Sequence, residues 1–171
     1  MIKFYSIQKS DFKIKKKIIS SIKNVIKKNN FILGNEVFEF ENKFSKFCGS
    51  KYSISCSNGT DAITLALLSL NIKKNSEVIL PAMTYASTFY AIINAGLKPV
   101  LVDINFDDPL INIEKIKKKI NKKTKVIIPV HLYGSVVDID VLKKKISKNI
   151  FIVDDCAQAH GAKFNNRKRV G

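Results

Sequence analysis

Short apolar runs alternate with amphipathic segments along most of the chain, and this alternation limits the possible folds more than any other feature. The runs are 52–56, 78–80, 99–102, 126–130 and 150–153, and the helical patterns lie near 60–70, 86–95, 113–120 and 139–147. Runs rich in β-branched residues without polar alternation suit strands that are buried on both faces. Strands separated by helices imply parallel pairing through right-handed crossovers. We therefore expect an α/β fold with a mostly parallel sheet.

Two helical patterns precede these runs. Residues 11–28 place apolar side chains at mostly helical spacing between lysines, and residues 35–47 carry a second pattern that ends at Gly49. A basic amphipathic helix such as the first can lie on a membrane surface or dock onto a partner. We favour packing on the body of its own protein or on a second subunit. The expected organisation is an N-terminal helical segment, 1–50, followed by an α/β domain, 51–171.

The chain length and the C-terminal residues indicate whether the chain forms a complete domain. A chain of 171 residues with 46% apolar residues can bury one substantial core, either as a single domain or as part of a larger one. The last residues, 167–171, show no pattern of a closing helix or strand. We therefore expect a truncated domain.

The formal net charge of +16 taken alone suggests a nucleic-acid or anionic-membrane partner. However, only Arg167 and Arg169 are arginine, and the other 28 basic residues are lysine. Recognition of bases and phosphates favours the arginine fork. We favour a solvated, lysine-rich surface and no nucleic-acid partner, with nucleic-acid binding and electrostatic steering of an anionic small substrate as the alternatives.

The cysteines and the hydropathy indicate a reduced, soluble, cytoplasmic protein. Cys48, Cys56 and Cys156 are odd in number and lack a pairing pattern, and lysines interrupt the N-terminal apolar residues before they reach signal-peptide length. No stretch approaches the roughly 20 apolar residues that cross a bilayer. No membrane association is expected.

The first two strand ends carry candidate ligand contacts. Residues 57–62, Ser-Asn-Gly-Thr-Asp-Ala, join the first run to a helix, and a glycine turn at a helix N-terminus can bind an anion. The turn lacks the P-loop and dinucleotide signatures, which disfavours an ATPase or a dehydrogenase; an ordinary capped junction is the alternative. Tyr85, after the second run, can cover a flat cofactor ring or simply pack.

Further candidates follow the last two runs. His131 is either a catalytic histidine or one satisfied by its neighbours. Asp154 and Asp155 are adjacent, so one should point into the crevice and the other away. A buried carboxylate needs a cationic partner, and a pyridinium nitrogen is one such partner. A metal held by Cys156, His160 and an aspartate is the disfavoured alternative.

Together these strand ends resemble the DegT/StrS-type sugar aminotransferases, which depend on pyridoxal 5′-phosphate and have the type I aminotransferase fold. Six stretches occur in the family's order across nearly the whole chain. They are Gly34 with Phe40 and Glu41, then 57–62, 77–85, 99–104, 124–134 and 154–162. Each match is modest alone, but six in order are specific.

The resemblance implies a role for each candidate residue. Gly59 and Thr60 would hold the cofactor phosphate, and Tyr85 would stack on the pyridine ring. Asp155 would pair with the ring nitrogen and keep it protonated, and Gln158 would contact the ring substituents. His131 and His160 are possible pocket-lining residues, and no metal site is implied.

The family's Schiff-base lysine lies beyond the stretch that matches this chain, past Gly171. None of the 28 lysines here stands in the matching context, so we expect this chain alone to be inactive. The resemblance implies a homodimeric parent enzyme that transfers an amino group, with glutamate as the donor, to a nucleotide-linked keto-sugar in amino-sugar or surface polysaccharide biosynthesis. The alternatives are a sugar dehydratase of the same family, a non-catalytic fragment and a lysine-rich nucleic-acid-binding protein.

Overall fold

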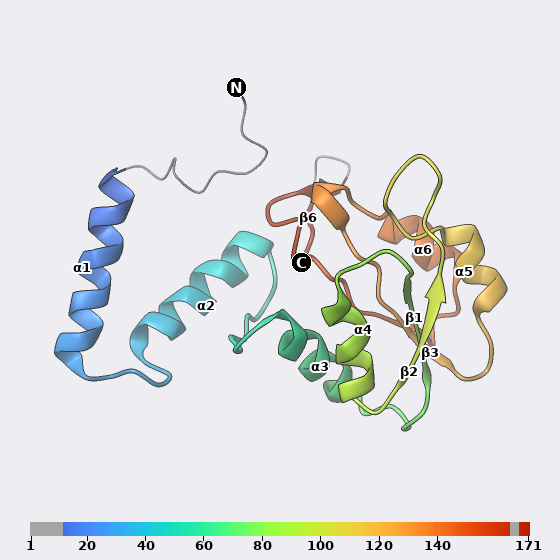
Figure 1. Ribbon diagram of the computed structural model, residues 1–171, viewed down its shortest axis with the longest axis horizontal. Coiled ribbons are helices and arrows are strands. Elements are labelled where there is room, and N and C mark those ends of the chain that lie inside the picture. The colour runs from blue at the N-terminus through green and yellow to red at the C-terminus, as the bar shows by residue number, and fades with distance from the viewer. Residues whose placement is uncertain (1–11, 165–167) are drawn as a thin grey trace.

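The computed structural model describes residues 12–164 and 168–171 as an α/β protein (Figure 1). The helices are α1 Phe12–Lys28, α2 Asn35–Cys48, α3 Gly59–Ser69, α4 Ala86–Asn94, α5 Ile113–Lys119 and α6 Ile139–Lys145, with a 3₁₀ turn, η1, at Leu132–Gly134. The strands are β1 Glu77–Pro81, β2 Lys98–Val102, β3 Thr124–Ile127, β4 Phe151–Ile152, β5 Lys163–Phe164 and β6 Lys168–Arg169.

The main sheet is parallel throughout and has the strand order β2-β1-β3-β4. The chain leaves β1 toward β2 on one side and then returns to β3 on the other side. The direction of winding therefore reverses between β1 and β3. Ligands of parallel α/β sheets bind beyond the carboxyl ends of the strands at such a reversal. The segments that follow β1 and β3 are thus the first place to look for a site.

Helices cover both faces of this sheet. Val78 and Leu80 of β1 belong to a core shared with α3 and α4, whereas Ile79 belongs to a second core shared with α5 and α6. This division follows from the alternation of side chains along a strand. Because Val78, Ile79 and Leu80 are all fully buried, β1 shows no polar alternation in the sequence. Truncating a fully buried leucine or isoleucine to alanine costs about 2–5 kcal/mol, so these two cores carry much of the stability.

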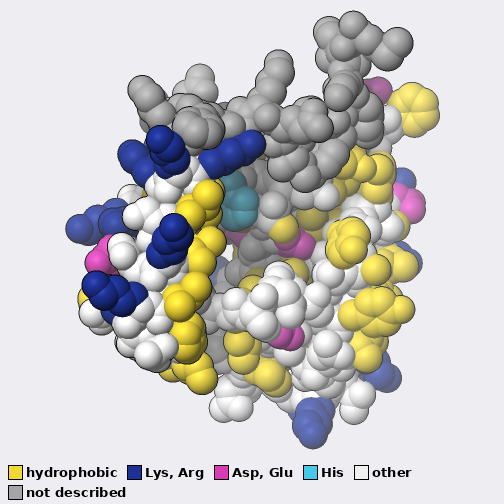
Figure 2. All heavy atoms as spheres, turned by 60° about the vertical axis from the view of Figure 1, so that its left-hand side comes forward, with side chains coloured by type: hydrophobic (Ala, Val, Ile, Leu, Met, Phe, Trp, Pro, Cys, Tyr) yellow, Lys and Arg dark blue, Asp and Glu magenta, His cyan; other side chains and the backbone are white. Residues whose placement is uncertain are grey.

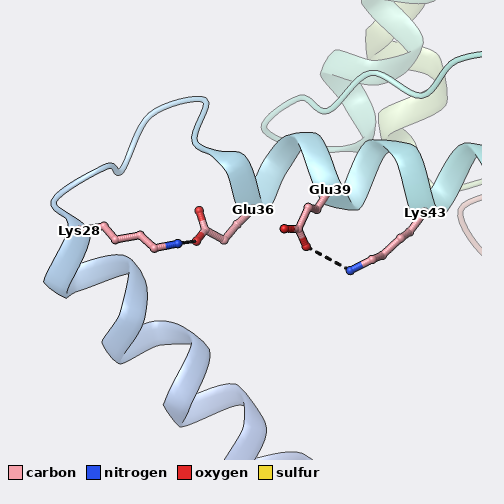
Figure 3. Close-up of polar contacts among 4 residues, drawn as sticks. All are labelled: Lys28, Glu36, Glu39 and Lys43. Carbon is pink, nitrogen blue, oxygen red and sulfur yellow. Dashed lines mark hydrogen bonds and ion pairs between the residues drawn. The ribbon is translucent and has the colours of Figure 1, made fainter.

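The two N-terminal helices lie to one side of the sheet (Figure 1). Gly49 ends α2 in the left-handed conformation, with φ 76°, and its N–H donates to the carbonyl of Ser45. Lys28 at the end of α1 pairs with Glu36 in the first turn of α2 at 2.9 Å (Figure 3). The hydrogen bond from Lys28 lowers the pKa of Glu36. Because both groups are exposed, the pair contributes little to stability.

One face of α1 is apolar and exposed. Figure 2 shows a row of hydrophobic side chains along this helix with lysines beside it. Its members are each more than half exposed: Ile14, Ile18, Ile19, Ile22 and Ile26. The described part of the chain therefore does not cover the face that was expected to pack on the body of the protein or on a second subunit. No helix within the described ranges has the length and apolarity to cross a membrane.

Several sequence predictions require correction. The run 52–56 is not a strand, and it lies outside the sheet; there the N–H of Ser55 donates instead to the Glu41 carboxylate at 2.7 Å. The prediction that no strand lies near the C-terminus was also wrong, because β6 pairs with β5 in an antiparallel hairpin. The other four runs are strands with shifted ends, and all six helices were expected. Asp11 and Arg167 lie outside the described residues.

Candidate functional site

Asp155 is held firmly at the carboxyl end of the sheet. Its N–H donates to the carbonyl of Pro129 at 3.0 Å, and its own carbonyl accepts from the N–H of His131 at 3.0 Å. The Asp155 residue is only 9% exposed. Its Oδ2 accepts a hydrogen bond from the Thr88 hydroxyl at 2.8 Å, and its Oδ1 accepts from the N–H of Ala157 at 3.2 Å. The carboxylate is therefore fixed through both its backbone and its oxygens.

The Asp155 carboxylate makes no ion pair with any residue in 12–164 or 168–171. Both of its hydrogen-bond donors, Thr88 and Ala157, are neutral. A buried carboxylate is costly unless a cation or strong donors compensate for the lost water. A carboxylate also has about four lone-pair sites, so two donors leave capacity for another. The group is thus suited to a cationic N–H such as a pyridinium.

The neighbouring Asp154 points to the other side of the sheet. Its side chain lines a cavity of about 520 Å³ and another of about 670 Å³, both together with Ile139 and Lys143 of α6. Asp155 meets Thr88 on α4, which covers the opposite face. This placement confirms that the two adjacent acids point in opposite directions.

The first turn of α4 follows β1 and faces Asp155. Thr84 and Thr88 lie four residues apart, and their hydroxyl oxygens are 2.9 Å from each other. Thr88 is fully buried. Tyr85 is the N-cap residue of the helix, and it is 73% exposed. The aromatic face of Tyr85 is therefore accessible, on the same helical turn that contacts Asp155.

The N-terminus of α3 presents two N–H groups that have no acceptor among the described residues. Asn58 satisfies the next two: its side chain accepts from the N–H of Asp61 at 2.9 Å, and its carbonyl accepts from the N–H of Ala62 at 3.0 Å. The N–H groups of Gly59 and Thr60 make no hydrogen bond within the described part of the chain. A Cβ on Gly59 would meet no atom within 4 Å. Open amides at the positive end of a helix suit an anion.

The Asp61 carboxylate lies beside these amides without occupying them. Its Oδ2 accepts from the Asn58 side chain at 2.9 Å and from the Ser57 hydroxyl. The helix itself packs along α4, where the Thr64 hydroxyl contacts the carbonyl of Ala91 at 3.4 Å. The phosphate-type site and the tyrosine therefore lie on neighbouring helices that cover the same face of the sheet.

His131 is completely buried beside the backbone of Asp155. Its Nδ1 accepts from the N–H of Val137 at 3.0 Å, which places the proton of the neutral ring on Nε2. That Nε2 has no hydrogen-bond partner among residues 12–164 and 168–171, and it lies 3.8 Å from the Asp154 carboxylate. Of the two ring nitrogens, Nδ1 therefore has a hydrogen-bond partner within the described residues and Nε2 does not.

Gln158 and His160 contact different parts of the protein. The Gln158 side-chain carbonyl accepts from the N–H of Tyr133 at 3.1 Å and so ties the turn after Asp155 to η1. The His160 ring packs edge-on against Phe44 of α2, with 5.9 Å between ring centroids. The structure therefore joins His160 to the N-terminal helices.

Cys156 lies next to Asp155, but its thiol is a poor nucleophile. Burial, followed by the charges of Asp154 and Asp155, raises the pKa of its thiol to about 12. Across the described ranges, no three or more histidine, cysteine, aspartate or glutamate side chains gather so that they could hold a metal ion. The metal alternative proposed for Cys156 and His160 has no such cluster to support it.

The structure links Asp155 with α4, whose N-cap residue is Tyr85, and it adds one residue that the sequence interpretation missed. That residue is Thr88, which the sequence patterns did not single out. Its signal was a pair of threonines spaced four apart where the chain enters a helix, with Thr84 just before the N-cap residue and Thr88 in the first turn. No hydrogen bond joins Gly59 or Thr60 to the Asp155 group within residues 12–164 and 168–171.

The fold is that of pyridoxal-phosphate-dependent aminotransferases. The structure of DesV from S. venezuelae in complex with a ketimine intermediate superposes with a TM-score of 0.89 at 33% identity, covering 93% of this chain and 43% of that one. A GDP-4-keto-6-deoxymannose-3-dehydratase with a trapped PLP-glutamate geminal diamine superposes with a TM-score of 0.87 at 30% identity, covering 100% and 45%.

The chain belongs to the DegT/DnrJ/EryC1/StrS aminotransferase family, which it matches over residues 12–171. A relative from Aneurinibacillus thermoaerophilus, dTDP-3-amino-3,6-dideoxy-alpha-D-galactopyranose transaminase, is 40% identical over 172 aligned positions, which cover 100% of this chain and 47% of the relative. The chain thus spans under half the length of the curated relatives it matches. The expected family and fold class are confirmed.

Proposed function

We propose that this chain forms the cofactor half-site of a pyridoxal-phosphate-dependent aminotransferase that acts on a nucleotide-linked keto-sugar. The observation that carries the proposal is the buried Asp155 carboxylate, which has two neutral donors and no ion pair among the described residues. Asp155 stands beyond the carboxyl ends of the strands next to the reversal of strand order, where α/β proteins bind ligands.

Each candidate residue has a task that its environment suits. The open amides of Gly59 and Thr60 hold the phosphate at the N-terminus of α3. The exposed ring of Tyr85 covers one face of the pyridine. Asp155 accepts a hydrogen bond from the ring nitrogen and keeps its proton in place. Gln158 lies one turn beyond Asp155 and contacts the ring substituents from the same side. Bound pyridoxal phosphate supplies an electron-accepting ring.

The names of the relatives support a nucleotide-linked sugar as the substrate. Several are named as transaminases of dTDP- or UDP-linked sugars, or as GDP-perosamine synthases. We infer a nucleotide-linked keto-sugar acceptor for the parent enzyme, with glutamate as the amino donor. The Schiff-base lysine belongs to a region past Gly171. A homodimer suits the exposed apolar face of α1. The three cysteines, all unpaired, fit a reducing cytoplasm.

A sugar dehydratase of the same family is the second candidate, because a GDP-4-keto-6-deoxymannose-3-dehydratase superposes about as well as the aminotransferase from Psychrobacter cryohalolentis does. The coding sequence beyond Gly171 separates the two. A lysine in a strand-to-turn segment rich in serine and phenylalanine favours transamination, and a histidine there favours dehydration. An immediate stop codon favours a non-catalytic fragment.

The test of the proposal is Asp155→Ala in the parent enzyme. We expect transamination to be abolished while the circular dichroism spectrum and the melting curve stay native. Asp154→Ala is the matched control, because that side chain points to the opposite face, and it should keep activity. Retained activity in Asp155→Ala would remove the ring-nitrogen assignment. Salt-dependent affinity for duplex DNA with no response to the cofactor would instead favour a nucleic-acid-binding protein.

A further inference from the structure

A directed chain of hydrogen bonds leads from the start of α4 to the candidate ring-nitrogen acid. An ionised carboxylate only accepts, so the Thr88 hydroxyl must donate to Asp155 Oδ2 across their 2.8 Å contact. A hydroxyl has one proton, so Thr88 has none left for Thr84. Thr84 must therefore be the donor across the 2.9 Å between the two hydroxyl oxygens. The order is Thr84 to Thr88 to Asp155.

We propose that Thr88, supported by Thr84, is a positioning residue that holds the Asp155 carboxylate in the orientation in which it meets the cofactor's ring nitrogen. This inference rests on the proposed function. The terminal torsion of an aspartate has a broad energy well, so the side chain needs external contacts to fix it. Thr88 provides such a contact, because it is fully buried and its β-branched side chain has few rotamers.

The same helical turn also carries Tyr85, three residues before Thr88. Tyr85 is the N-cap residue of α4 and Thr88 is the third residue of the helix, so the backbone of this one turn fixes the positions of both. The turn thus sets the position of the tyrosine that covers the ring face and, through Thr88, the position of the acid that meets the ring nitrogen. A shift of α4 would move both contacts together. In addition, the Thr84 hydroxyl polarises that of Thr88 and strengthens its bond to the carboxylate.

The test uses pyridoxamine 5′-phosphate, which binds without a Schiff-base lysine, labelled with ¹⁵N in the ring. Its nitrogen chemical shift reports whether the ring is protonated. Thr88→Val keeps the shape of the side chain and removes the donor, whereas Thr88→Ser keeps the donor. We expect Thr88→Val to move the shift toward that of the neutral ring and to weaken binding about tenfold, as expected for the loss of a hydrogen bond to a charged group. Thr88→Ser should match the unaltered chain.

Two further variants make every outcome decisive. Asp155→Asn should move the nitrogen shift at least as far as Thr88→Val does; an unchanged shift in this variant would overturn the ring assignment itself. A changed shift in Asp155→Asn with an unchanged shift in Thr88→Val would overturn only the positioning role. If Thr88→Val does not fold, Thr84→Val decides. Thr84→Val should move the shift in the same direction by less, and an unchanged shift would refute the chain of donors.

Discussion

Replacing Gly59 with proline should weaken anion binding at the N-terminus of α3 without lowering the stability of the fold. Proline at the first residue of a helix loses an N–H that the helix does not use, and its fixed φ suits that position. Gly59 is the first residue of α3, and a side chain there meets open space. The preceding residue, Asn58, has φ −163° and ψ 173°, an extended conformation that proline accepts before it.

The substitution Gly59→Pro therefore removes one of the two open amides with little strain. A hydrogen bond to a charged group is worth about 1.5–3 kcal/mol, so the affinity for pyridoxamine 5′-phosphate should fall about 10- to 150-fold. Folding stability should instead stay the same or rise by about 0.4–1 kcal/mol, since proline restricts the unfolded chain.

The assay is isothermal titration for affinity and urea unfolding for stability. Gly59→Ala is the matched control, because it adds a side chain but keeps the N–H, and it should bind with nearly unaltered affinity. Equal affinity in the proline and alanine variants would refute the phosphate site at this helix. A large loss of stability in Gly59→Pro would refute the assigned helix start.

Three further results are expected. Iodoacetamide at pH 8 should modify the exposed Cys56 early and Cys156 last, because the pKa of the latter is raised to about 12; early labelling of Cys156 by mass spectrometry would contradict its burial. Lys115→Met should return the pKa of Asp103, which the hydrogen bond from Lys115 lowers, toward its ordinary value in an NMR titration. The pair stabilises the fold above the ordinary carboxyl pKa, and its contribution is lost as the pH falls through the lowered one; an unmoved titration would exclude the pairing. Ile18→Lys on the exposed face of α1 should reduce self-association in sedimentation velocity, and unchanged association would exclude that face as a contact.

The sheet was predictable because burial on both faces leaves uninterrupted apolar runs in the sequence. Val78 and Leu80 pack on one side and Ile79 on the other, so none of them needed to be polar. The run 52–56 is different, because Ser53 and Ser55 interrupt its apolar residues, and no strand lies beside it in the described part of the chain. An apolar run indicates that a segment tends to be buried. A strand also needs a neighbouring strand to hydrogen-bond with, and local sequence does not specify that neighbour.

The candidate site was predictable only where a residue type and its place at a strand end sufficed. Asp155 and Tyr85 were chosen as candidates in this way. Thr88 was not, because its role depends on a contact across 67 positions of sequence that only the packing of α4 on the sheet creates. The hairpin of β5 and β6 was missed for a different reason. Each of its strands has only two residues, which is too short to show a periodicity.

The most direct test of the half-site is binding of pyridoxamine 5′-phosphate to this chain, compared with binding of pyridoxamine and with binding to Asp155→Ala. Isothermal titration should give one saturable site. Removal of the phosphate from the ligand should weaken binding at least about tenfold, because the Gly59 and Thr60 amides lose their charged acceptor. Asp155→Ala should weaken it by a similar factor, because the ring nitrogen loses its carboxylate. Equal affinities in all three titrations, or no saturable binding at all, would contradict the account.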